Sequence, residues 1–324
     1  PDVSKNEEVK VIPFKGFNFF KYTKPFIALS VIIIFAGIIA LGVRGVNLGV
    51  EYQAGSDISI ATNKNITKKG LSQDLDKLKL DRQSITINDD EVTIRISDVL
   101  DGDKVEDVTN YFEDKYDAKT SIGVISNVVK QELVKNAILS VIVALIGIIL
   151  YISVRFKFSY AVGGVVSLFH DVLIVCALFA VFHLEVSSMF IVAILTIIGY
   201  SINDTIVTFD RIREELSKVD SKKLKKADVW EISNRAVCET FVRSLHTFIT
   251  TLIPIVILIF MGSREILTFN LAMLFGLVVG VYSSIYIATV IFATIEAKSA
   301  GKPKKRKPIY TDEYEEKLVK GINC

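Results

Sequence analysis

Three charged residues lie within or directly beside stretches of sequence that are otherwise strongly apolar. Asp171 lies inside the run 158–182, Asp204 lies inside the run 186–209, and Arg243 directly precedes another apolar run. An ionisable side chain in hydrocarbon costs several kcal/mol, so it usually marks an ion pathway, a relay or a partner site. Burial favours the neutral form of a carboxylate, and a nearby guanidinium favours the ionised form. These residue types therefore suit the reversible binding of a proton or a cation.

Hydroxyl residues accompany the charged residues at helical spacing. Asp204 lies five residues before the end of its run and Arg243 lies at the start of the next, so both belong to the same third of the membrane and can meet. Residues three and four apart share one face of a helix. Three such stripes occur: Ser201, Asp204, Thr205 and Thr208; Arg243, Thr247, Thr250, Thr251 and Pro254; and Gly163, Ser167, His170 and Asp171.

The pair of Asp204 and Arg243 has two interpretations, which spacing alone leaves open. A conformational change that alters the distance between the two side chains would change the proton affinity of the carboxylate, as a proton-coupled device requires. One proton that crosses about 100 mV releases about 2.3 kcal/mol, enough to bias a conformation. Alternatively, the pair is structural and the hydroxyls satisfy the helix backbone. His170 and His246 are isolated and make a poor metal site, so we expect no metal and no cofactor.

Composition indicates the kind of element that must position these residues. Of the 324 residues 51% are hydrophobic, the mean hydropathy is +0.44, and 23% are charged. Apolar and charged residues must then be segregated along the chain, which excludes a simple soluble globular enzyme and a disordered chain. The formal net charge of +2 gives no case for nucleic-acid binding.

Six apolar runs are long enough to cross a bilayer, whose hydrocarbon core of about 30 Å needs roughly 20 helical residues. They are 25–43, 136–154, 158–182, 186–209, 244–263 and 266–295. The first run is too long for the apolar region of a cleaved signal peptide, so we expect it to remain as an anchor. We predict an α-helical integral membrane protein with six transmembrane helices.

The distribution of Lys and Arg predicts the orientation of these helices. Five of these residues lie in 1–24, two in 155–159, eight in 210–240 and eight in 294–324, whereas the short loops 183–185 and 264–265 hold none and one. By the positive-inside rule both termini are cytoplasmic. The segment 44–132 is long enough to be exported whatever its charge.

The segment 44–132 is predicted to fold as a domain outside the cytoplasm. Alternation of apolar residues predicts strands at 47–52, 57–62, 84–88, 91–97 and 118–124, and helical periodicity predicts helices at 68–80 and 102–116. Asp89 and Asp90 are expected to form a turn between two strands. The order β-α-β-β-α-β is typical of a ferredoxin-like α+β module. Such a module on a membrane protein binds a partner more often than it catalyses.

The remaining segments complete the predicted organisation. They are a cytoplasmic segment at 1–24, the first span at 25–43, spans two to four within 133–209, a cytoplasmic loop at 210–240, the last two spans within 241–295, and a basic cytoplasmic tail at 296–324. Within the loop, 227–241 is predicted as an interfacial helix anchored by Trp230. The basic residues of the tail suit contact with anionic membrane lipid or a ribosome, and equally a solvated flank.

No nucleotide-binding glycine motif, zinc-protease motif or G-x-S-x-G motif occurs, so we expect no enzymatic activity.

One long segment resembles a known family. Residues 199–214, Gly-Tyr-Ser-Ile-Asn-Asp-Thr-Ile-Val-Thr-Phe-Asp-Arg-Ile-Arg-Glu, are similar to the fourth-helix signature of the SecF proteins in the bacterial SecD/SecF export family. His170-Asp171-Val172 resembles the family's pair on the third helix, and Arg243 followed by Thr250-Thr251-Leu252 resembles its fifth-helix pattern. Residues 45–55 are similar to the element G-x-N-x-G-[IV]-D-F-x-G-G after the first helix, with departures at Glu51, Tyr52 and Ala54.

The resemblance implies a six-helix half-transporter of the RND superfamily, multi-pass in the bacterial cytoplasmic membrane. It implies SecD as the partner that completes a twelve-helix unit, SecYEG and an exported unfolded polypeptide as further partners, and protons or sodium ions as the driving ions. Asp204 would carry the ion and Arg243 would modulate it. The weaker members of the ion relay would be Asp210, Thr208, Thr247 and Asp171.

Two alternative functions stay open on the sequence. A small-molecule or lipid exporter of the same superfamily would have the same membrane part, although its porter modules are usually larger than the segment 44–132. A scaffold that only organises the translocon would need no ion relay.

Overall fold

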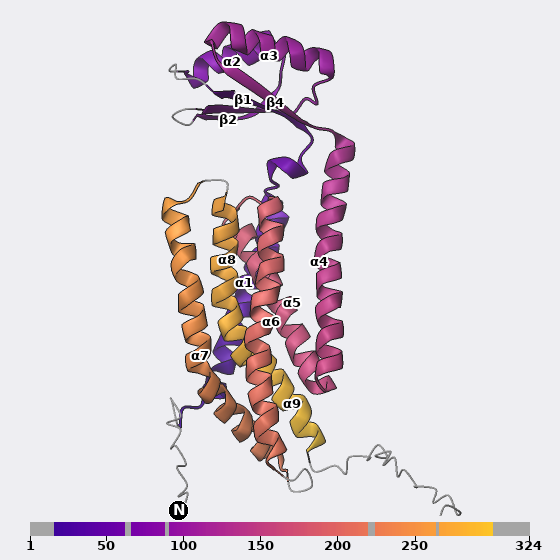
Figure 1. The fold of residues 1–324 in the computed structure, drawn as a ribbon, viewed down its shortest axis with the longest axis vertical. Coiled ribbons are helices and arrows are strands. Elements are labelled where there is room, and N and C mark those ends of the chain that lie inside the picture. Colours follow the sequence, from indigo (N-terminus) through magenta and orange to yellow (C-terminus); the bar gives the residue numbers. More distant parts are fainter. Residues whose placement is uncertain (1–15, 62–65, 88–90, 220–223, 264–265, 301–324) are drawn as a thin grey trace, which may run out of the picture.

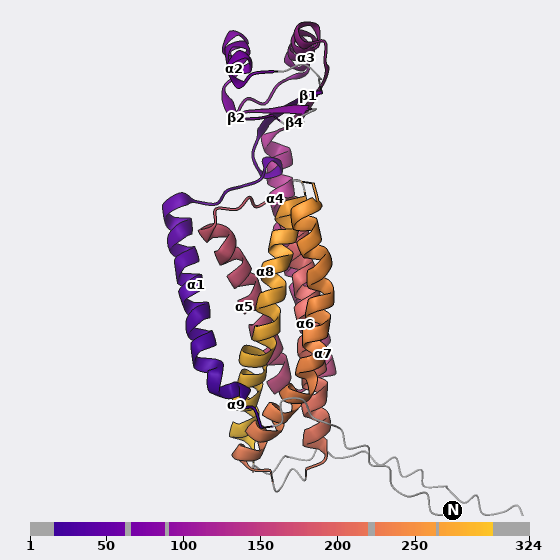
Figure 2. The ribbon, with the colours of Figure 1, turned by 90° about the vertical axis from the view of Figure 1, so that its left-hand side faces the viewer.

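The computed structural model describes residues 16–61, 66–87, 91–219, 224–263 and 266–300. It consists of a bundle of long helices and a small α+β domain that stands beyond one end of the bundle (Figure 1 and Figure 2). The first helix begins, and the last helix ends, at the opposite end of the bundle.

The small domain has the predicted order of helices and strands. Its elements are β1 (Gly55–Ala61), α2 (Lys68–Lys77), β2 (Arg82–Ile87), β3 (Glu91–Ile96), α3 (Gly102–Tyr116) and β4 (Lys119–Ile125). The strands form an antiparallel sheet in the order β2-β3-β1-β4, and both helices cover one face of it (Figure 2). This is the ferredoxin-like arrangement, as predicted. The turn expected at Asp89 and Asp90 lies outside the described residues.

Alternating isoleucines build the core of this domain. Ile58 and Ile60 of β1 and Ile94 and Ile96 of β3 are fully buried. Successive residues of a strand point to opposite faces of the sheet, so these four side chains share the face that the helices cover. They pack with the helices around Phe112, which is also fully buried.

A buried carboxylate joins the two helices of the domain. Asp74 of α2 is 1% exposed and accepts hydrogen bonds from three side chains of α3: Tyr111 at 3.0 Å, Tyr116 at 2.6 Å, and Lys115. Burial alone raises the pKa of Asp74, but the hydrogen bonds from Lys115, Tyr116 and Tyr111 outweigh it and hold the pKa below its ordinary value. Burial, together with the hydrogen bond to Asp74, raises the pKa of Tyr116 to about 12.

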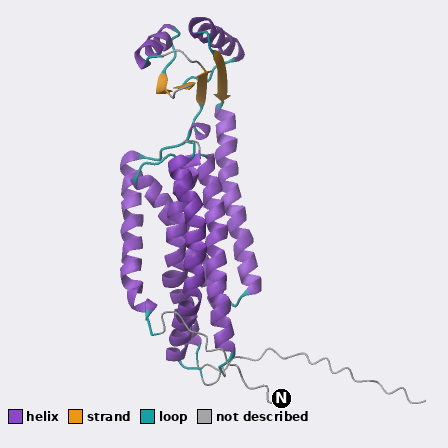
Figure 3. Cartoon of the chain, turned by 60° about the vertical axis from the view of Figure 1, so that its left-hand side comes forward, coloured by secondary structure: helices purple, strands orange, loops and turns teal. Residues whose placement is uncertain are grey.

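Six of the described helices are long and apolar enough to cross a membrane, which confirms the prediction. They are α1 (Thr23–Arg44), α4 (Asn127–Arg155), α5 (Phe158–Val181), α6 (Ser188–Ser217), α7 (Lys226–Met261) and a last span made of α8 (Leu267–Ser283), a π turn (Ser284–Ala288) and α9 (Thr289–Ser299). The interior of the bundle is formed by α5, α6 and the last span, whereas the membrane-spanning parts of α1, α4 and α7 contribute few buried residues. Figure 3 shows the long helices running side by side from one end of the bundle to the other.

The segment predicted as a strand at 47–52 does not join the sheet. Leu48 instead makes an isolated parallel bridge with Val186, and Val50–Tyr52 form a single 3-10 turn. Gly49 permits this close approach, because a Cβ there would lie 2.9 Å from the Cα of Ser187. The connection from α1 to the domain is thereby held against the loop that precedes α6.

The interfacial helix predicted at 227–241 is not a separate element. It forms the first turns of α7, which runs without a break from Lys226 to Met261. No Gly or Pro occurs in this helix before Pro254, so no residue ends it at the membrane surface. Its apolar side is buried against protein, and Trp230 packs edge-on against Phe20 with 5.3 Å between ring centroids.

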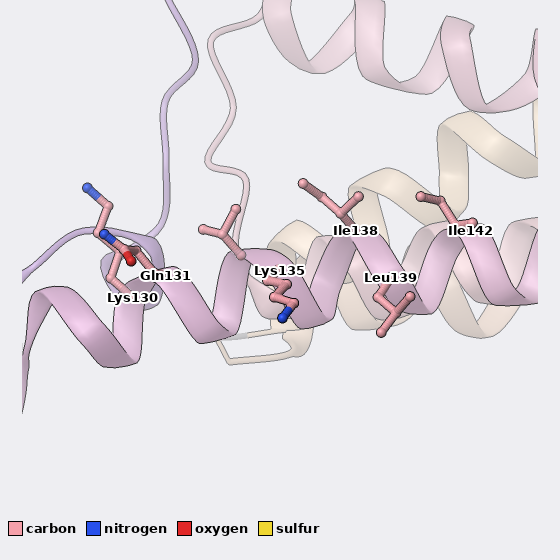
Figure 4. Close-up of a pocket in the computed structure, with 7 residues that line it drawn as sticks. Lys130, Gln131, Lys135, Ile138, Leu139 and Ile142 are labelled. Atoms are coloured by element: carbon pink, nitrogen blue, oxygen red, sulfur yellow. The ribbon is translucent and has the colours of Figure 1, made fainter.

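α4 lies at the edge of the bundle (Figure 1). Val141, Leu145 and Ile148 pack against the core, whereas most of its other side chains are exposed. A surface depression of about 550 Å³ along it is lined by residues of α4 alone. Figure 4 shows that Ile138 and Ile142 point to one side of the helix, whereas Lys135 and Leu139 point to the other. Because these side chains do not converge, we interpret this surface as a lipid-facing helix and not as a ligand site.

Candidate functional site

Asp204 lies on α6 where this helix meets α7. The Ser244 hydroxyl of α7 donates a hydrogen bond to Oδ1 of Asp204. Ser284, the first residue of the π turn, lies within hydrogen-bonding reach of the same carboxylate. A hydroxyl both donates and accepts, so these partners suit the ionised carboxylate and the neutral carboxyl alike. The site can therefore bind and release a proton or a cation without losing its hydrogen bonds.

Arg243 lies beside this carboxylate but does not pair with it. Its charge acts on Asp204, yet among the described residues the two groups form no ion pair. The Arg243 side chain is exposed on the surface of the bundle. Adjacent helical residues point about 100° apart, so Arg243 turns outward when Ser244 faces Asp204. Contact between the carboxylate and the guanidinium would need another conformation of the Arg243 side chain, a movement of α7 against α6, or both.

A second, fully buried carboxylate lies on α5. Asp171 is 1% exposed, accepts a hydrogen bond of 2.5 Å from the Ser201 hydroxyl of α6, and lies 3.1 Å from Nδ1 of His170. Nε2 of His170 lies 2.8 Å from Oγ of Ser30 on α1 and 3.3 Å from the hydroxyl oxygen of Tyr282 on α8. Four helices thus meet at one hydrogen-bonded cluster around Asp171.

The polar stripe predicted on α6 connects the two carboxylates to the rest of the bundle. Ser201 contacts α5, Asp204 and Thr208 contact α7, and Thr205 contacts the π turn. All four side chains share one side of α6, because they are three or four residues apart. A rotation of α6 about its axis would therefore change all of these contacts together.

The π turn of the last span lies directly against this stripe. The backbone N–H of Thr289 donates to the carbonyl of Ser284, five residues earlier, which is the hydrogen bond of a π turn. Gly163 of α5 packs so closely on the turn that a Cβ there would lie 2.6 Å from the carbonyl oxygen of Ala288. Such turns occur frequently at functional sites. Here the turn places Ser284 next to Asp204.

Two predicted members of the ion relay have polar partners other than Asp204. The side chain of Asp210 is 42% exposed and pairs with Arg213 of its own helix at 2.8 Å. Thr247 is exposed, and its hydroxyl donates to the carbonyl of Ser244 in its own helix at 2.9 Å. Within the described ranges, neither side chain is hydrogen-bonded to Asp204.

Sequence reasoning missed Ser30, Tyr282 and Ser244 as members of these clusters. Ser30 carried a usable signal, since it is the one hydroxyl residue in 25–43 and a lone hydroxyl in a span usually faces another helix. Tyr282 and Ser244 lie in spans that contain several polar residues, so no spacing distinguishes them.

Charged residues tie α6 to α7 at the end of the bundle opposite the domain. Arg211 of α6 pairs with Glu239 of α7 and, at 3.0 Å, with Glu215 of its own helix. Glu215 in turn lies 2.9 Å from Arg235 and 2.6 Å from Lys218. This network holds the end of α6 and the start of α7 together. It can therefore act as the pivot when the angle between the two helices changes.

Comparison with protein families adds an independent observation. Residues 104–298 match the family described as protein export membrane protein SecD/SecF, C-terminal. The match covers more than half of the chain and includes both carboxylates of the site. The chain belongs to the SecD/SecF family of protein-export membrane proteins. The resemblance noted in residues 199–214 is thereby confirmed.

Relatives of the SecF type match along most of their length. The chain is 34% identical over 295 residues to protein translocase subunit SecF of Alicyclobacillus acidocaldarius. The alignment covers 88% of this chain and 95% of that protein. It is 37% identical over 304 residues to protein translocase subunit SecDF of Bacillus subtilis, which covers 93% of this chain but 41% of that protein. The chain thus matches nearly the whole length of that SecF protein and less than half the length of that SecDF protein.

A solved structure supports the same assignment of fold. The crystal structure of SecDF from Thermus thermophilus, described as a translocon-associated membrane protein, matches with a TM-score of 0.73 at 28% sequence identity. The match covers 86% of this chain and 38% of that one. The six-helix bundle with its small inserted domain is therefore a fold of this family.

Proposed function

We propose that this chain is a SecF-type subunit that assists protein export across the bacterial cytoplasmic membrane by ion-driven conformational change. The observation that carries the proposal is the Asp204 carboxylate, lined by hydroxyls inside an apolar span. Arg243 lies next to it and forms no ion pair in the described part of the chain. The chain would catalyse no covalent reaction and bind no cofactor, and its small ligand would be the coupling ion, a proton or sodium.

The partners of Asp204 suit a two-state cycle. Ser244 and Ser284 can hydrogen-bond to either charge state of the carboxyl group, whereas Arg243 favours the ionised state alone. Binding of an ion to Asp204 would remove the charge that attracts Arg243, and release of the ion would restore it. Each cycle would then move α7 against α6. The pivot would be the charged network that joins the end of α6 to the start of α7.

α6 links the ion site to the small domain. Ser188 at the start of this helix donates a hydrogen bond of 3.0 Å to Glu51, and the N–H of Gly49 donates one of 2.8 Å to the carbonyl of Val186. Residues 47–51 lead directly into β1. A shift of α6 would therefore move the base of the domain, and this mechanical link supports the proposal.

An exposed polar surface supports a partner within the membrane. Asn203 of α6 and Arg243, His246, Thr247 and Thr250 of α7 are exposed on the surface of this chain. Polar and charged side chains at membrane depth are costly when they face lipid. We infer that a second six-helix half, SecD, covers this surface, either as a separate chain or as part of the same one.

The proposed orientation places the small domain outside the cytoplasm. The helix ends that adjoin the basic segments, namely the start of α1, the end of α6, the start of α7 and the end of α9, lie at the end of the bundle opposite the domain (Figure 1). The positive-inside rule makes that end cytoplasmic. The domain would then meet an unfolded polypeptide that leaves SecYEG. Ion movement at Asp204 would change the position of the domain relative to that polypeptide.

Gradient-stimulated export into inverted membrane vesicles tests this function. Asp204→Asn keeps the size of the side chain but cannot change charge, so we expect the stimulation by the gradient to disappear while insertion of the chain is unchanged. Asp210→Asn is the matched control on the same helix, and it should export normally. Export by the Asp204→Asn variant at the wild-type rate would reject the proposal and leave the chain with a scaffolding role.

A further inference from the structure

A shallow, open groove on the surface of the small domain lies between α2 and the outermost strand. Its volume is about 590 Å³. One wall is the exposed side of the first turns of α2, and the other is the outer strand β2. The lining residues are Lys68, Lys69, Ser72, Gln73, Arg82, Gln83, Ser84 and Ile85. All of them are described by the structure, and the groove is separate from the ion site in the membrane.

β2 is an edge strand of the sheet that the described residues form. Among the described strands it pairs with β3 alone. The register is irregular between Arg82 and Ser84 and regular from Ser84 to Ile87. The strand contains no proline, and its side chains are exposed apart from the half-buried Ile85. An edge strand presents a row of backbone N–H and C=O groups to which another extended chain can pair.

The charge of the groove indicates what would pair there. Three of its lining residues, Lys68, Lys69 and Arg82, are cationic, and none is acidic. Lys68 and Lys69 form the first turn of α2, where the backbone N–H groups add to the positive potential. A second copy of this domain would bring like charges together at β2, so self-pairing is disfavoured. Ile85 and Ile87 offer apolar contact to alternate residues of an added strand.

We propose that this groove binds an extended polypeptide segment that carries acidic side chains, and that the segment joins the sheet as a fifth strand beside β2. The groove lies at the sheet edge away from α4, on the open side of the domain (Figure 1). Identification of the segment as part of an exported chain rests on the proposed function, whereas the strand-addition site does not.

Fluorescence anisotropy on the full chain in detergent tests the site. The probe is a labelled ten-residue peptide of alternating valine and glutamate. The triple variant Lys68→Glu, Lys69→Glu and Arg82→Glu should bind it roughly tenfold or more weakly, since three attractive contacts become repulsive. The same variant should gain affinity for the valine and lysine version of the peptide. The control variant Lys77→Glu with Lys104→Glu changes exposed residues outside the groove and should bind the acidic peptide as the wild type does.

Two methylated probes test the strand pairing itself. Alternate N–H groups of a strand point to the same neighbour, so N-methylation of one set of alternate amides should abolish binding, while methylation of the other set should preserve it. Equal binding of both methylated peptides, or unchanged binding by the triple variant, would overturn the proposal. Asp204→Asn should bind the peptide normally, so loss of the ion-driven function and loss of this site can be told apart.

Discussion

Ser244 donates a hydrogen bond to Asp204, and the adjacent Arg243 points away from that carboxylate into the surroundings of the bundle. The two residues of α7 occupy alternative positions with respect to the same acidic group. A turn of about 100° per residue separates them, so a shift of α7 combined with a new conformation of the long Arg243 side chain would exchange a hydroxyl partner for a cation. This arrangement leads to predictions that separate the ion site from the packing around it.

Loss of the Ser244 hydroxyl is expected to impair function more than stability. In Ser244→Ala the Asp204 carboxylate loses the hydrogen bond from α7, and a hydrogen bond to a charged group is worth about 1.5–3 kcal/mol. We expect gradient-stimulated export to fall by roughly tenfold or more. The control is Ser140→Ala, because the Ser140 hydroxyl bonds only to a carbonyl of its own helix, α4, in the described part of the chain. Equal effects of both changes would argue against a special role for Ser244.

The π turn is expected to be sensitive to one glycine and tolerant at its neighbour. A Cβ at Gly163 would lie 2.6 Å from the carbonyl oxygen of Ala288, whereas a Cβ at Gly164 would meet its nearest atom, in the Ile152 side chain, at an ordinary 3.6 Å. Gly163→Ala should destabilise the bundle by about 1–3 kcal/mol. Gly164→Ala should leave it nearly unchanged. Thermal inactivation in the same detergent compares the two variants. Equal midpoint temperatures would show that the π turn accommodates the added Cβ without loss of stability.

The buried carboxylate of the small domain is expected to make its stability depend on pH. The pKa of folded Asp74 lies below its ordinary value of 3.8. The stabilisation is therefore fully present above that value and is lost as the pH falls through the lower folded value. In Asp74→Asn this dependence should vanish, and the domain should lose about 1–3 kcal/mol at neutral pH. Amide hydrogen exchange of α2 and α3 measures both effects, and identical pH profiles for the two proteins would contradict the assignment.

The exposed polar side of α7 is expected to be a partner surface. Thr250→Trp places a large side chain on that surface, so co-purification of a second six-helix subunit from native membranes should decrease. Ile39→Trp is the control, because Ile39 is exposed on α1, which lies apart from α7 in Figure 2. Retention of the partner by the Thr250→Trp variant would locate the interface elsewhere.

The fold was largely predictable because it rests on patterns that the chain repeats. Apolar runs of membrane-spanning length predict the six spans, and the alternation of Ile58 and Ile60 with polar residues predicts a strand with one covered face. The segment 47–52 also alternates, yet it binds the loop before α6, since tertiary contact at Gly49 decides its pairing. Local periodicity does not contain that information.

The candidate site was predictable as a stripe but not as a set of contacts. Helical spacing places Asp204 with Thr205 and Thr208 on one side of α6, and the structure agrees. Which residue of α7 faces Asp204 depends on the rotation of that helix about its axis, and a difference of one residue decides between Arg243 and Ser244. The cluster of His170 with Ser30 depends on which helices become neighbours. Spacing within one helix says nothing about that choice.

Ion movement through purified protein tests the central claim most directly. The chain would be reconstituted with its six-helix partner in liposomes, and proton or sodium entry would be followed with an ion-sensitive dye under an imposed gradient. We expect entry with the wild type and with Asp210→Asn, and no entry above the background of empty liposomes with Asp204→Asn. Entry at the wild-type rate in the Asp204→Asn liposomes would contradict the account.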